Sequence, residues 1–367
     1  MNGKSDKVIV INFVAKHSYI FVINMVKGLV ENGCKAVAII SKNMPEIEQW
    51  RRIKGLKLIE IDGYTSLSDF IPKLLRYYCK DVPRIKRIVK KYDDVVMYIP
   101  MLSYWSYFVK KSLNQLDYVF DMHDPISHSK KHILLIFFNY QLGLKAKKIR
   151  ILSETFREHV KKKYKKTDRQ IVVIPSGCEN VKKNSNVEIV RYEDDKLNFL
   201  FQGRIDEYKG LEILAKAYKR LSLEYQSVTL TIAGSGDITP YSKELTDLPR
   251  CTVINRWITD EEVASLFNDR NVVAILPYKT ATQSGVINVA MPCGTPVIAS
   301  ACGAIPEQIQ DGKTGYLVKP GDIDELYIKM KYVLNNQDEL KVIRTNGYER
   351  MESLDWKILS KKLMLEF

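Results

Sequence analysis

Long apolar runs are absent from this 367-residue sequence. A membrane-spanning helix needs roughly 18 consecutive apolar residues, and no stretch approaches that length. The first segment, MNGKSDKVIVINFVA, contains a short, β-branched apolar stretch, without the longer apolar core and the small-residue cleavage site of a signal peptide. We therefore interpret it as a first β-strand, and we expect a cytoplasmic protein without a transmembrane helix.

Cysteine arrangements with a chemical function are also absent. The six cysteines form no Cys-x-x-Cys pair and no Cys/His spacing of the kind that holds a metal ion. They are scattered through apolar segments, which is typical of buried thiols in a reducing cytoplasm. The cysteine pattern therefore gives no support to a metal-binding domain.

Acidic residues are scarce in the first half of the chain only. The whole sequence has a net charge of +14, but residues 1–190 carry 35 Lys and Arg against 18 Asp and Glu, a net charge of +17. The remaining residues carry 22 against 25, a net charge of −3. This asymmetry predicts two domains with different partners, of which the first faces something anionic.

Segments typical of strands alternate with segments typical of helices along the whole chain. Such alternation produces parallel sheets, and the length suits two domains of about 150 residues each. We predict an α/β protein with two Rossmann-like, doubly wound domains. The predicted strands are Lys7–Val14, Ala36–Ile40, Lys57–Ile61, Val95–Ile99, Tyr118–Asp121, Ile149–Leu152, Ile171–Ile174, Lys196–Phe201, Val228–Ala233, Cys251–Ile254, Val272–Leu276, Pro296–Ala299 and Gly315–Val318.

The boundary between the domains is expected in the segment Val181–Lys196. This segment is polar and mixed in charge, and it separates two series of alternating strands and helices. We therefore predict an N-terminal domain over residues 1–185 and a C-terminal domain over residues 186–353. A single large sheet with an insertion is the alternative organisation.

The segment Leu200–Leu214, LFQGRIDEYKGLEIL, has the features of a phosphate-binding loop. A predicted strand ends near Gly203, a helix begins near Gly210, and Arg204 and Lys209 lie five positions apart around the turn. A guanidinium binds phosphate with two donors, an ammonium acts as a point charge, and a helix N-terminus adds free N–H groups. A solvated surface loop is the alternative interpretation.

Two further strand ends carry weaker signals. Ile232–Asp237, IAGSGD, is similar to a dinucleotide-binding loop but lacks its third glycine, and alone it favours a plain tight turn. The segment VINRWITDEEVASLF places Arg256 and Trp257 at a strand end, where they either hold a nucleobase or pack at a domain surface. A helix follows, and Thr259 with Glu262 predicts a capping box at its start.

Charged side chains are completely absent from Thr280 to Ile305. A predicted strand that ends at Pro277 leads into a small polar turn, and a helix-like segment opens at Gly285. The free N–H groups at a helix N-terminus attract anions. The turn is therefore a candidate anion-binding loop, although it contains no cation of its own.

In this order and at this spacing, the segments resemble the nucleotide-sugar-dependent retaining glycosyltransferases of the GT-B fold, family 4, also called glycosyltransferase group 1. The resemblance covers about a third of the chain, all in the second domain. It implies two Rossmann-like domains that face each other across a cleft, the first binding the acceptor and the second the donor. It also implies that a final helix over residues 354–367 returns to the first domain. The carrying segments are GRIDEYKG (203–210), AGSGD (233–237), RWITDEEVASLF (256–267), ILPY (275–278), SGVINVAMPCGTPVIAS (284–300) and GAIPEQIQDGKTGYLV (303–318).

The resemblance assigns catalytic roles to two cations. Arg204 and Lys209 match the pair that grips the donor diphosphate and neutralises the leaving group. Because these side chains take the place of a metal ion, neither a metal nor another cofactor is expected. The donor is expected to be a UDP-sugar, with a GDP-sugar as the alternative. The further donor-binding positions that the resemblance implies are Gly203, Gly234, Arg256, Trp257, Ile258, Thr282, Gln283, Ser284, Gly285 and Val286.

Two glutamates that the family often has eight positions apart are missing. One of them holds the donor sugar and the other the ribose, and here Ala281 and Val289 occupy their positions. Neither side chain can accept a hydrogen bond from a sugar hydroxyl. Either the chemistry is lost, or the polar side chains of Thr282, Gln283 and Asn288 take over. A branch of the family with a similar ATQSGV-like loop favours the second alternative.

In the first domain, the segment Phe120–His128, FDMHDPISH, follows a predicted strand. His123 and Asp124 resemble the family's histidine-acid-proline segment, in which the histidine approaches the donor sugar and the reacting centre. A structural, hydrogen-bonded histidine is the alternative. Lys16 and His17 follow the first strand, where relatives often have glycines near the acceptor, and they are candidate acceptor contacts.

Basic segments explain the positive charge of the first half. Ile71–Tyr92, Lys130–Arg150 and Lys161–Lys166 interleave cations with aromatic and aliphatic residues. Such segments suit an anionic membrane surface or a lipid diphosphate. Nucleic acid is the rival partner, and each segment alone is also compatible with a solvated face. Three such segments in one half favour the membrane.

These observations together predict a hexosyltransferase. We expect it to move a sugar, with retained anomeric configuration, from a nucleotide diphosphate to a polyprenyl-diphosphate-linked saccharide during the synthesis of a bacterial surface polysaccharide such as a capsule, O-antigen or exopolysaccharide. It would associate peripherally with the inner face of the plasma membrane and would not bind nucleic acid. The alternatives are a nucleotide-sugar epimerase or phosphorylase of the same shape, and a catalytically impaired nucleotide-sugar-binding protein.

Overall fold

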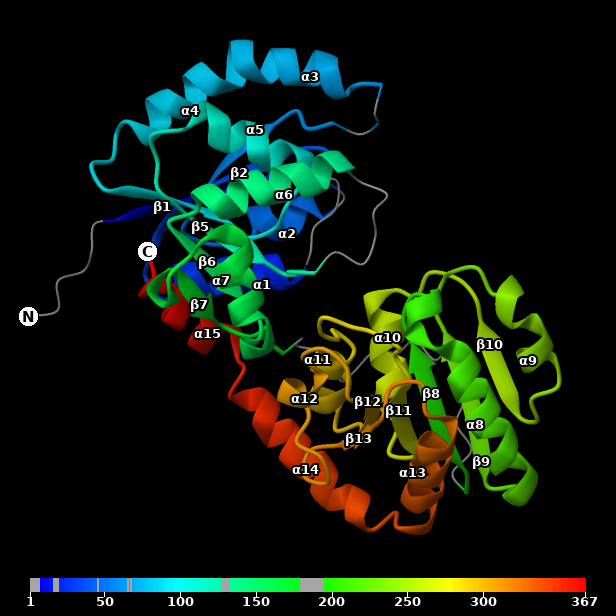
Figure 1. Cartoon of the computed structure of the whole chain (residues 1–367). Coiled ribbons are helices and arrows are strands. Elements are labelled where there is room, and N and C mark those ends of the chain that lie inside the picture. Colours follow the sequence, from blue (N-terminus) through cyan, green and yellow to red (C-terminus); the bar gives the residue numbers. More distant parts are fainter. Residues whose placement is uncertain are drawn as a thin grey trace, which may run out of the picture. The chain divides into compact units, whose positions relative to one another are not determined.

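The chain folds into two compact units, which are described one at a time (Figure 1). Unit 1 comprises residues 1–176 and 355–367, and unit 2 comprises residues 177–354. The computed structural model describes residues 7–15, 20–44, 46–64, 66, 68–126, 133–178 and 195–367. Most of the predicted boundary segment, Val181–Lys196, lies outside these residues.

Unit 1 contains a sheet of seven parallel strands in the order β3-β2-β1-β4-β5-β6-β7. The chain winds from β1 to one edge and then from β4 to the other, which is the doubly wound topology that was expected. The strands are β1 (Val8–Phe13), β2 (Lys35–Ser41), β3 (Leu56–Ile61), β4 (Val95–Ile99), β5 (Tyr118–Met122), β6 (Lys148–Ile151) and β7 (Ile171–Val173). The helices are α1 (Ile20–Glu31), α2 (Ile47–Arg51), α3 (Phe70–Arg76), a π-helical turn (Tyr77–Asp81), α4 (Val82–Val89), α5 (Tyr104–Ser112), α6 (Ile133–Lys145), α7 (Arg157–Tyr164) and α15 (Trp356–Met364).

Unit 2 repeats this topology with six parallel strands in the order β10-β9-β8-β11-β12-β13. The strands are β8 (Leu197–Gln202), β9 (Val228–Ala233), β10 (Cys251–Ile254), β11 (Val272–Leu276), β12 (Val297–Ser300) and β13 (Tyr316–Val318). The helices are α8 (Leu211–Glu224), α9 (Ser242–Thr246), α10 (Asp260–Phe267), α11 (Ile287–Ala290), α12 (Ile305–Gln308), α13 (Ile323–Asn335) and α14 (Glu339–Glu352).

The predicted fold class is confirmed. Each of the thirteen predicted strand segments matches one observed strand, and the ends agree to within one residue. Strands of this kind are easy to identify because a parallel sheet with helices on both faces buries every side chain of its central strands. All five residues of β11 and the first five of β8 are buried accordingly.

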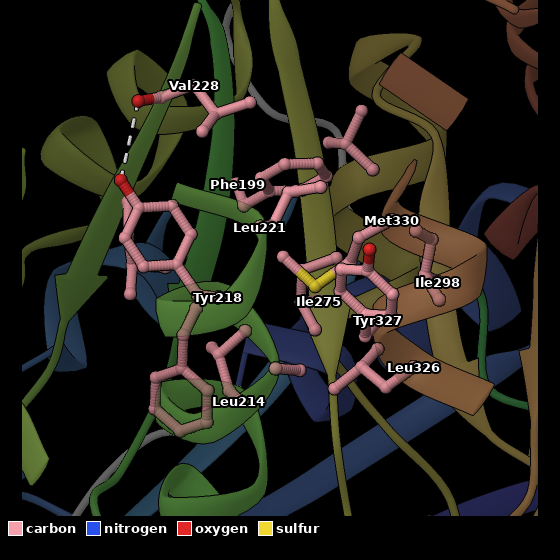
Figure 2. Close-up of a cluster of buried hydrophobic side chains, with 14 of the residues drawn as sticks. Phe199, Leu214, Tyr218, Leu221, Val228, Ile275, Ile298, Leu326, Tyr327 and Met330 are labelled. Carbon is pink, nitrogen blue, oxygen red and sulfur yellow. Dashed lines mark hydrogen bonds between the residues drawn. The ribbon is translucent and has the colours of Figure 1, made fainter. Parts of the chain in front are cut away.

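The strands of unit 2 contribute to two separate apolar cores. Phe199 of β8 and Ile275 of β11 pack with Leu221 of α8 and Met330 of α13, as Figure 2 shows. The alternating neighbours on the same strands, such as Leu200, belong to the second core with α10, α11 and α12. Burial on both faces fixes the strands, so the loops at their carboxyl ends start from well-defined positions.

Unit 1 includes the last helix of the chain. α15 packs against α1 so closely that a Cβ added to Gly28 would lie 2.5 Å from Ser360 Oγ. Asn32 Nδ2 at the end of α1 donates a hydrogen bond to Lys357 O at 2.8 Å. Leu359 and Leu363 of α15 are fully buried. The glycine is thus required by helix contact, and α15 is an integral part of unit 1.

Candidate active site

The topology of unit 2 brings two of the predicted loops together. The winding direction of the sheet reverses between β8 and β11, and ligands of doubly wound sheets bind outside the carboxyl ends of strands at such a point. The segment that follows β8 is GRIDEYKG, and the segment that follows β11 is PYKTATQSGV. A Cβ added to Gly203 would lie 3.9 Å from Val286 Cγ2, so these two loops are neighbours.

Two glycines allow the backbone to approach itself closely at these strand ends. Gly203 follows β8 with a φ of +133°, and Gly234 follows β9 with a φ of +154°. A Cβ on Gly234 would lie only 1.8 Å from Gly203 O. Any other residue at position 234 would therefore push the end of β9 away from the loop that carries Arg204 and Lys209.

Lys209 is held between aromatic rings from both loops. Its Nζ lies 3.8 Å from the ring centroid of Tyr278, which follows β11, and 5.1 Å from that of Tyr208. The main chain supports this arrangement, because Lys279 N–H donates to Tyr208 O at 2.8 Å. The rings attract the ammonium group and fix its position beside the loop after β11.

The electrostatic environment of Lys209 differs from that of Arg204. Burial lowers the pKa of Lys209, and the charge of Arg204 lowers it further, whereas Tyr208 and Asp206 oppose the change. Arg204 is exposed, and its guanidinium lies 3.5 Å from the Asp206 carboxylate. The two cations of the predicted pair thus lie on one loop, one half-buried and one exposed.

The uncharged loop after β11 is buried and braced from behind. Thr282 and Ser284 are buried, as is Asn288 on α11, whereas Gln283 is half-buried. Ala304 N–H donates to Thr282 O at 3.1 Å. At the positions of the missing glutamates, Ala281 is buried and Val289 is half-buried. Polar side chains are therefore present in this loop and on α11, and Gln283 is the most accessible of them.

The expected helix at Gly285 is shorter than predicted, and one expected anion donor is occupied. The helix α11 begins at Ile287 and has four residues, because a 3-10 turn over Met291–Cys293 follows it. Ser284 N–H already donates to Gln308 Oε1 at 2.9 Å. Among the described residues, the N–H groups of Gly285 and Val286 have no hydrogen-bond partner. A phosphate would therefore meet two free amides here and not the three that were expected.

The segment predicted to meet the nucleobase is held by hydrogen bonds to Glu262. The predicted capping box of α10 is confirmed, because Thr259 Oγ1 accepts from Glu262 N–H and Glu262 accepts from Thr259 N–H. Arg256 donates to both carboxylate oxygens of Glu262, at 2.7 and 2.9 Å. The hydrogen bonds from Arg256 are the largest cause, and the one from the Thr259 backbone is the second, of a pKa of Glu262 that is lowered to about 2.

The three base-contacting candidates differ in what they offer to a ligand. The guanidinium of Arg256 is engaged with the carboxylate of Glu262. Ile258 is buried, whereas the Trp257 side chain is 76% exposed. Trp257 therefore presents the free aromatic surface of this segment, and a planar base can stack on such a surface.

Comparison with known proteins identifies a family that is similar to unit 2. Residues 196–336 match the family of "Glycosyl transferases group 1". Sulfoquinovosyl transferase SQD2 of Arabidopsis thaliana is 28% identical over 181 residues, which are 47% of this chain and 34% of the relative. Phosphatidyl-myo-inositol mannosyltransferase of Mycolicibacterium smegmatis is 27% identical over 195 residues, which are 53% of this chain and 50% of the relative. Over residues 196–336, which lie in unit 2, this chain is therefore similar to the group 1 glycosyl transferases.

A solved structure extends the likeness to the whole chain. The crystal structure of Anabaena HepE in complex with UDP and glucose matches 97% of this chain and 98% of its own chain, with a TM-score of 0.71 and 17% sequence identity. At this identity the likeness shows the GT-B fold alone. The chain spans about a third to a half of the length of the two curated relatives that it matches.

In unit 1, His123 directly follows β5. Its Nε2 donates a hydrogen bond to Pro100 O at 3.0 Å, and its ring centroid lies 4.7 Å from that of Phe21. Burial lowers the pKa of His123, and although Asp121 opposes this effect, the charge of Arg150 adds to it. The imidazole is therefore predominantly neutral at neutral pH. The hydrogen bond to Pro100 O uses only Nε2 of the ring. The second ring nitrogen, Nδ1, can therefore still contact a ligand.

A buried ion pair that the sequence did not signal fixes the end of β5. Asp121 Oδ2 accepts hydrogen bonds from Tyr98 on β4 and from Arg150 on β6, both at 2.5 Å, and all three side chains are buried. Arg150 also donates to Ile174 O and Pro175 O at 3.0 and 2.9 Å. The strand that positions His123 is thus tied to both of its neighbours and to the last residues of unit 1 before the chain enters unit 2.

The remaining candidates in unit 1 have different outcomes. Asp124 is exposed beside His123. Lys16 and His17 lie outside the described residues, so their assignment as acceptor contacts stays a prediction.

Part of the predicted basic surface is structural, because Lys166 is buried and donates to Leu144 O at 2.9 Å. None of the described helices combines the length and the apolar content that crossing a membrane requires.

Two residues that contact the candidate donor-site residues were missed by sequence reasoning. Tyr278 was seen only as part of a strand end, yet its ring lies under the Lys209 ammonium. Gln308 was seen only as part of a turn region, yet its side chain binds the main chain of Ser284. Neither residue has a local signal in the sequence. Gln308 binds Ser284, which lies more than 20 positions away, and Tyr278 contacts the Lys209 ammonium, which comes from another strand end.

Proposed function

We propose that the protein transfers a sugar from a nucleoside diphosphate, preferably UDP, to an acceptor hydroxyl with retained anomeric configuration and without a metal ion. The observation that carries this proposal is the Lys209 ammonium, held at the carboxyl ends of β8 and β11 within 3.8 Å of the Tyr278 ring centroid. Arg204 on the same loop and the free amides of Gly285 and Val286 complete an environment that suits a departing diphosphate.

The proposed chemistry needs charge neutralisation more than proton transfer. As the bond between the sugar and the diphosphate breaks, negative charge grows on the leaving phosphate oxygen. Lys209 and Arg204 would balance this charge, and Trp257 would stack on the base. His123, whose neutral imidazole can accept or donate hydrogen bonds, would contact the donor sugar as the family resemblance implies. No protein nucleophile is part of the proposal.

The donor sugar would be bound without the usual pair of glutamates. Thr282, Gln283 and Asn288 are the polar side chains of the loop and of α11 that are available for its hydroxyl groups. Neutral amides and hydroxyls bind a sugar less strongly than carboxylates do. We therefore expect a higher KM for the donor than in relatives that have both acids, rather than a loss of turnover.

A donor screen tests this function. The purified protein is incubated with a panel of UDP-sugars and GDP-sugars, and nucleotide release is followed with and without a lipid-linked acceptor fraction. Release from one donor that the acceptor fraction increases is the expected result. Conversion of the donor into another nucleotide sugar without an acceptor and without nucleotide release would favour an epimerase, and nucleotide release that depends on phosphate would favour a phosphorylase. Nucleotide binding without turnover would favour an impaired binding protein.

Substitution of Lys209 links the activity to the site. Lys209→Ala and Lys209→Met should abolish turnover, by about three orders of magnitude if the ammonium stabilises the leaving group as an oxyanion-hole donor does. Lys209→Met keeps the aliphatic contact with the rings, so its fold should be intact by circular dichroism and thermal unfolding. Lys216→Ala, an exposed lysine of α8, is the matched control. Full activity of both Lys209 variants would refute the donor-site assignment.

We further propose that the acceptor is a polyprenyl-diphosphate-linked saccharide of a bacterial surface polysaccharide, used at the inner face of the plasma membrane. The surface of unit 1 supports this proposal. α6 exposes Ile133, Leu134 and Phe137 with exposed fractions of 76%, 63% and 49%. Apolar side chains on a helix of a strongly basic domain suit an interface that contains anionic lipids.

Vesicle flotation tests the membrane contact. Serine substitutions of Ile133, Leu134 and Phe137 should reduce binding to vesicles rich in phosphatidylglycerol by at least about tenfold, because each buried apolar side chain contributes roughly 1.5–3 kcal/mol. The matched control is a pair of serine substitutions at Ile328 and Val342 of unit 2, which are each 61% exposed. Equal binding of the α6 variant and the control variant would refute the assignment of α6.

A further inference from the structure

Gln308 forms an unusual pair of hydrogen bonds with the loop after β11. Its Oε1 accepts from Ser284 N–H at 2.9 Å, and its Nε2 donates to Ser284 O at 3.0 Å. The same Nε2 lies 3.4 Å from Asn288 Oδ1 on α11. One side-chain amide thus satisfies both main-chain groups of one loop residue, as a neighbouring strand would do in a sheet.

The segment that carries Gln308 is itself fixed. Arg350 of α14 donates from Nε to Gln308 O at 3.0 Å and from a second nitrogen to Glu307 O. Gly303 lies so near the loop that a Cβ at its position would come within 1.7 Å of Ala281 O. Gln308 therefore reaches the loop from a support that cannot move freely, and its amide can define where Ser284 lies.

Charged side chains do not help to hold this loop. It contains no charged side chain, and the positions where the family often has glutamates are Ala281 and Val289. Inside the loop region, the Ser284 hydroxyl has one further contact, with Tyr278 OH at 3.3 Å. The next two residues, Gly285 and Val286, carry the amides that have no partner among the described residues. Their direction depends on how the Ser284 peptide is held.

We propose that Gln308 is a positioning residue of the donor site, whose amide holds Ser284 so that the N–H groups of Gly285 and Val286 point toward the donor diphosphate. This inference rests on the proposed function. In this arrangement, Ser284 N–H donates to Gln308 within the protein, and the N–H groups of Gly285 and Val286 donate to the ligand. It also gives the loop a neutral support at the place where the family relies on acidic side chains.

Removing the amide tests the proposal. Gln308→Met keeps the length of the side chain and loses both hydrogen bonds. UDP affinity, measured by calorimetry, should fall about tenfold or more, and the donor KM should rise equally, while kcat stays within about twofold. Gln310→Met is the matched control, because the exposed Gln310 side chain makes no hydrogen bond among the described residues. A purely structural role would lower the unfolding temperature and the active fraction without changing the donor KM.

Gln308→Glu provides a second test that depends on protonation. A carboxylate can accept from Ser284 N–H but repels Ser284 O and Asn288 Oδ1, whereas a protonated carboxyl group can donate to one of them, as the glutamine does. Hydrogen bonds that require the neutral form raise the pKa of such a group. UDP affinity of this variant should therefore be weak at pH 8 and recover toward the wild-type value as the pH falls to 5.5, where the wild-type protein shows no such gain.

The outcomes separate this inference from the proposed function. If the wild-type protein binds neither UDP nor GDP, the proposed function fails and the role of Gln308 fails with it. If the wild-type protein binds the nucleotide and both Gln308 variants bind it equally well at all pH values, the inference alone fails. Hydrogen exchange without nucleotide adds a direct check, since the Ser284 amide should lose protection in Gln308→Met. Unchanged protection would also overturn the inference.

Discussion

At the scale of single residues, the proposed chemistry depends on a lysine whose surroundings oppose its charge. Lys209 is half-buried between two tyrosine rings, and burial lowers its pKa. Such a group loses its proton more easily than a lysine in water, so it holds a bound diphosphate less strongly as the pH rises. The same desolvation strengthens its attraction for a diphosphate near neutral pH, because few water molecules compete.

The depressed pKa leads to a prediction for the alkaline side of the pH profile. Because the active form is the ammonium, kcat/KM for the donor should decline as the pH rises through a pKa below the ordinary lysine range. The measurement is kcat/KM from neutral to strongly alkaline pH. Lys209→Arg should be less active but should lack this decline, since a guanidinium stays protonated throughout. A decline of the same shape in Lys209→Arg would assign it to another group.

Sequence reasoning proposed site residues that lie on characteristic motifs and missed contacts that form between distant segments. Arg204, Lys209 and the capping box of α10 follow directly from local spacing. The engagement of Arg256 with Glu262 and of Ser284 N–H with Gln308 does not, because each depends on how two segments face each other. Glutamine at the end of a short helix carries no signal of its own, and only the packed structure reveals its partner.

At the scale of elements, the loops depend on glycines as much as on the residues that meet the ligand. Gly210 begins α8 with a φ of +67°, and a Cβ there would lie 2.0 Å from Pro277 O. The contact joins the loop after β8 to the loop after β11. A larger residue at this position must therefore displace the segment that carries Tyr278, and with it the environment of Lys209.

Gly210→Ala should thus affect both stability and donor binding. We expect the free energy of unfolding to fall by about 2 kcal/mol or more, since a backbone strain of roughly 1 kcal/mol adds to a collision with a main-chain oxygen. Gly294→Ala is the matched control, because Gly294 has a φ of +73° and open space around its Cβ position. It should lose only about 1 kcal/mol and keep its UDP affinity. The measurements are denaturant unfolding and calorimetry, and equal effects of the two substitutions would contradict the prediction.

The elements themselves were largely predictable, while the transitions between them were not. Buried parallel strands such as β11 are continuous apolar runs, and less buried ones such as β10 were located from their place in the alternation of strands and helices. The helix expected from Gly285 to the residues before Gly294 is instead a four-residue helix followed by a 3-10 turn. Pro292 explains part of this difference, because it lacks the N–H that would continue the α-helical pattern from Asn288.

At the scale of the whole molecule, unit 1 is not continuous in the sequence. Unit 1 is assembled from residues 1–176 and 355–367, and α15 supplies buried side chains to it. The effect of a substitution in α15 should therefore appear in unit 1, although its nearest neighbours in sequence belong to unit 2.

Leu359→Ala tests this assignment. The side chain is fully buried, and its truncation should cost about 2–5 kcal/mol. Hydrogen exchange should show faster opening throughout the unit 1 sheet and unchanged protection in the strands of unit 2. Leu326→Ala, in α13 of unit 2, is the matched control and should give the reverse pattern. A uniform loss of protection in both units after either substitution would contradict the division.

The hydrogen bond from Cys178 N–H to Leu354 O, at 3.1 Å, has a consequence for how such proteins can be recombined. It fastens the first residues of unit 2 to the last, so the inserted half of the molecule begins and ends at one place. A segment with adjacent ends can be replaced by another of similar fold without stretching the remainder of the chain. If the proposed division of labour holds, exchange of residues 177–354 for the matching half of a relative should change the nucleotide sugar that is used and leave the acceptor unchanged.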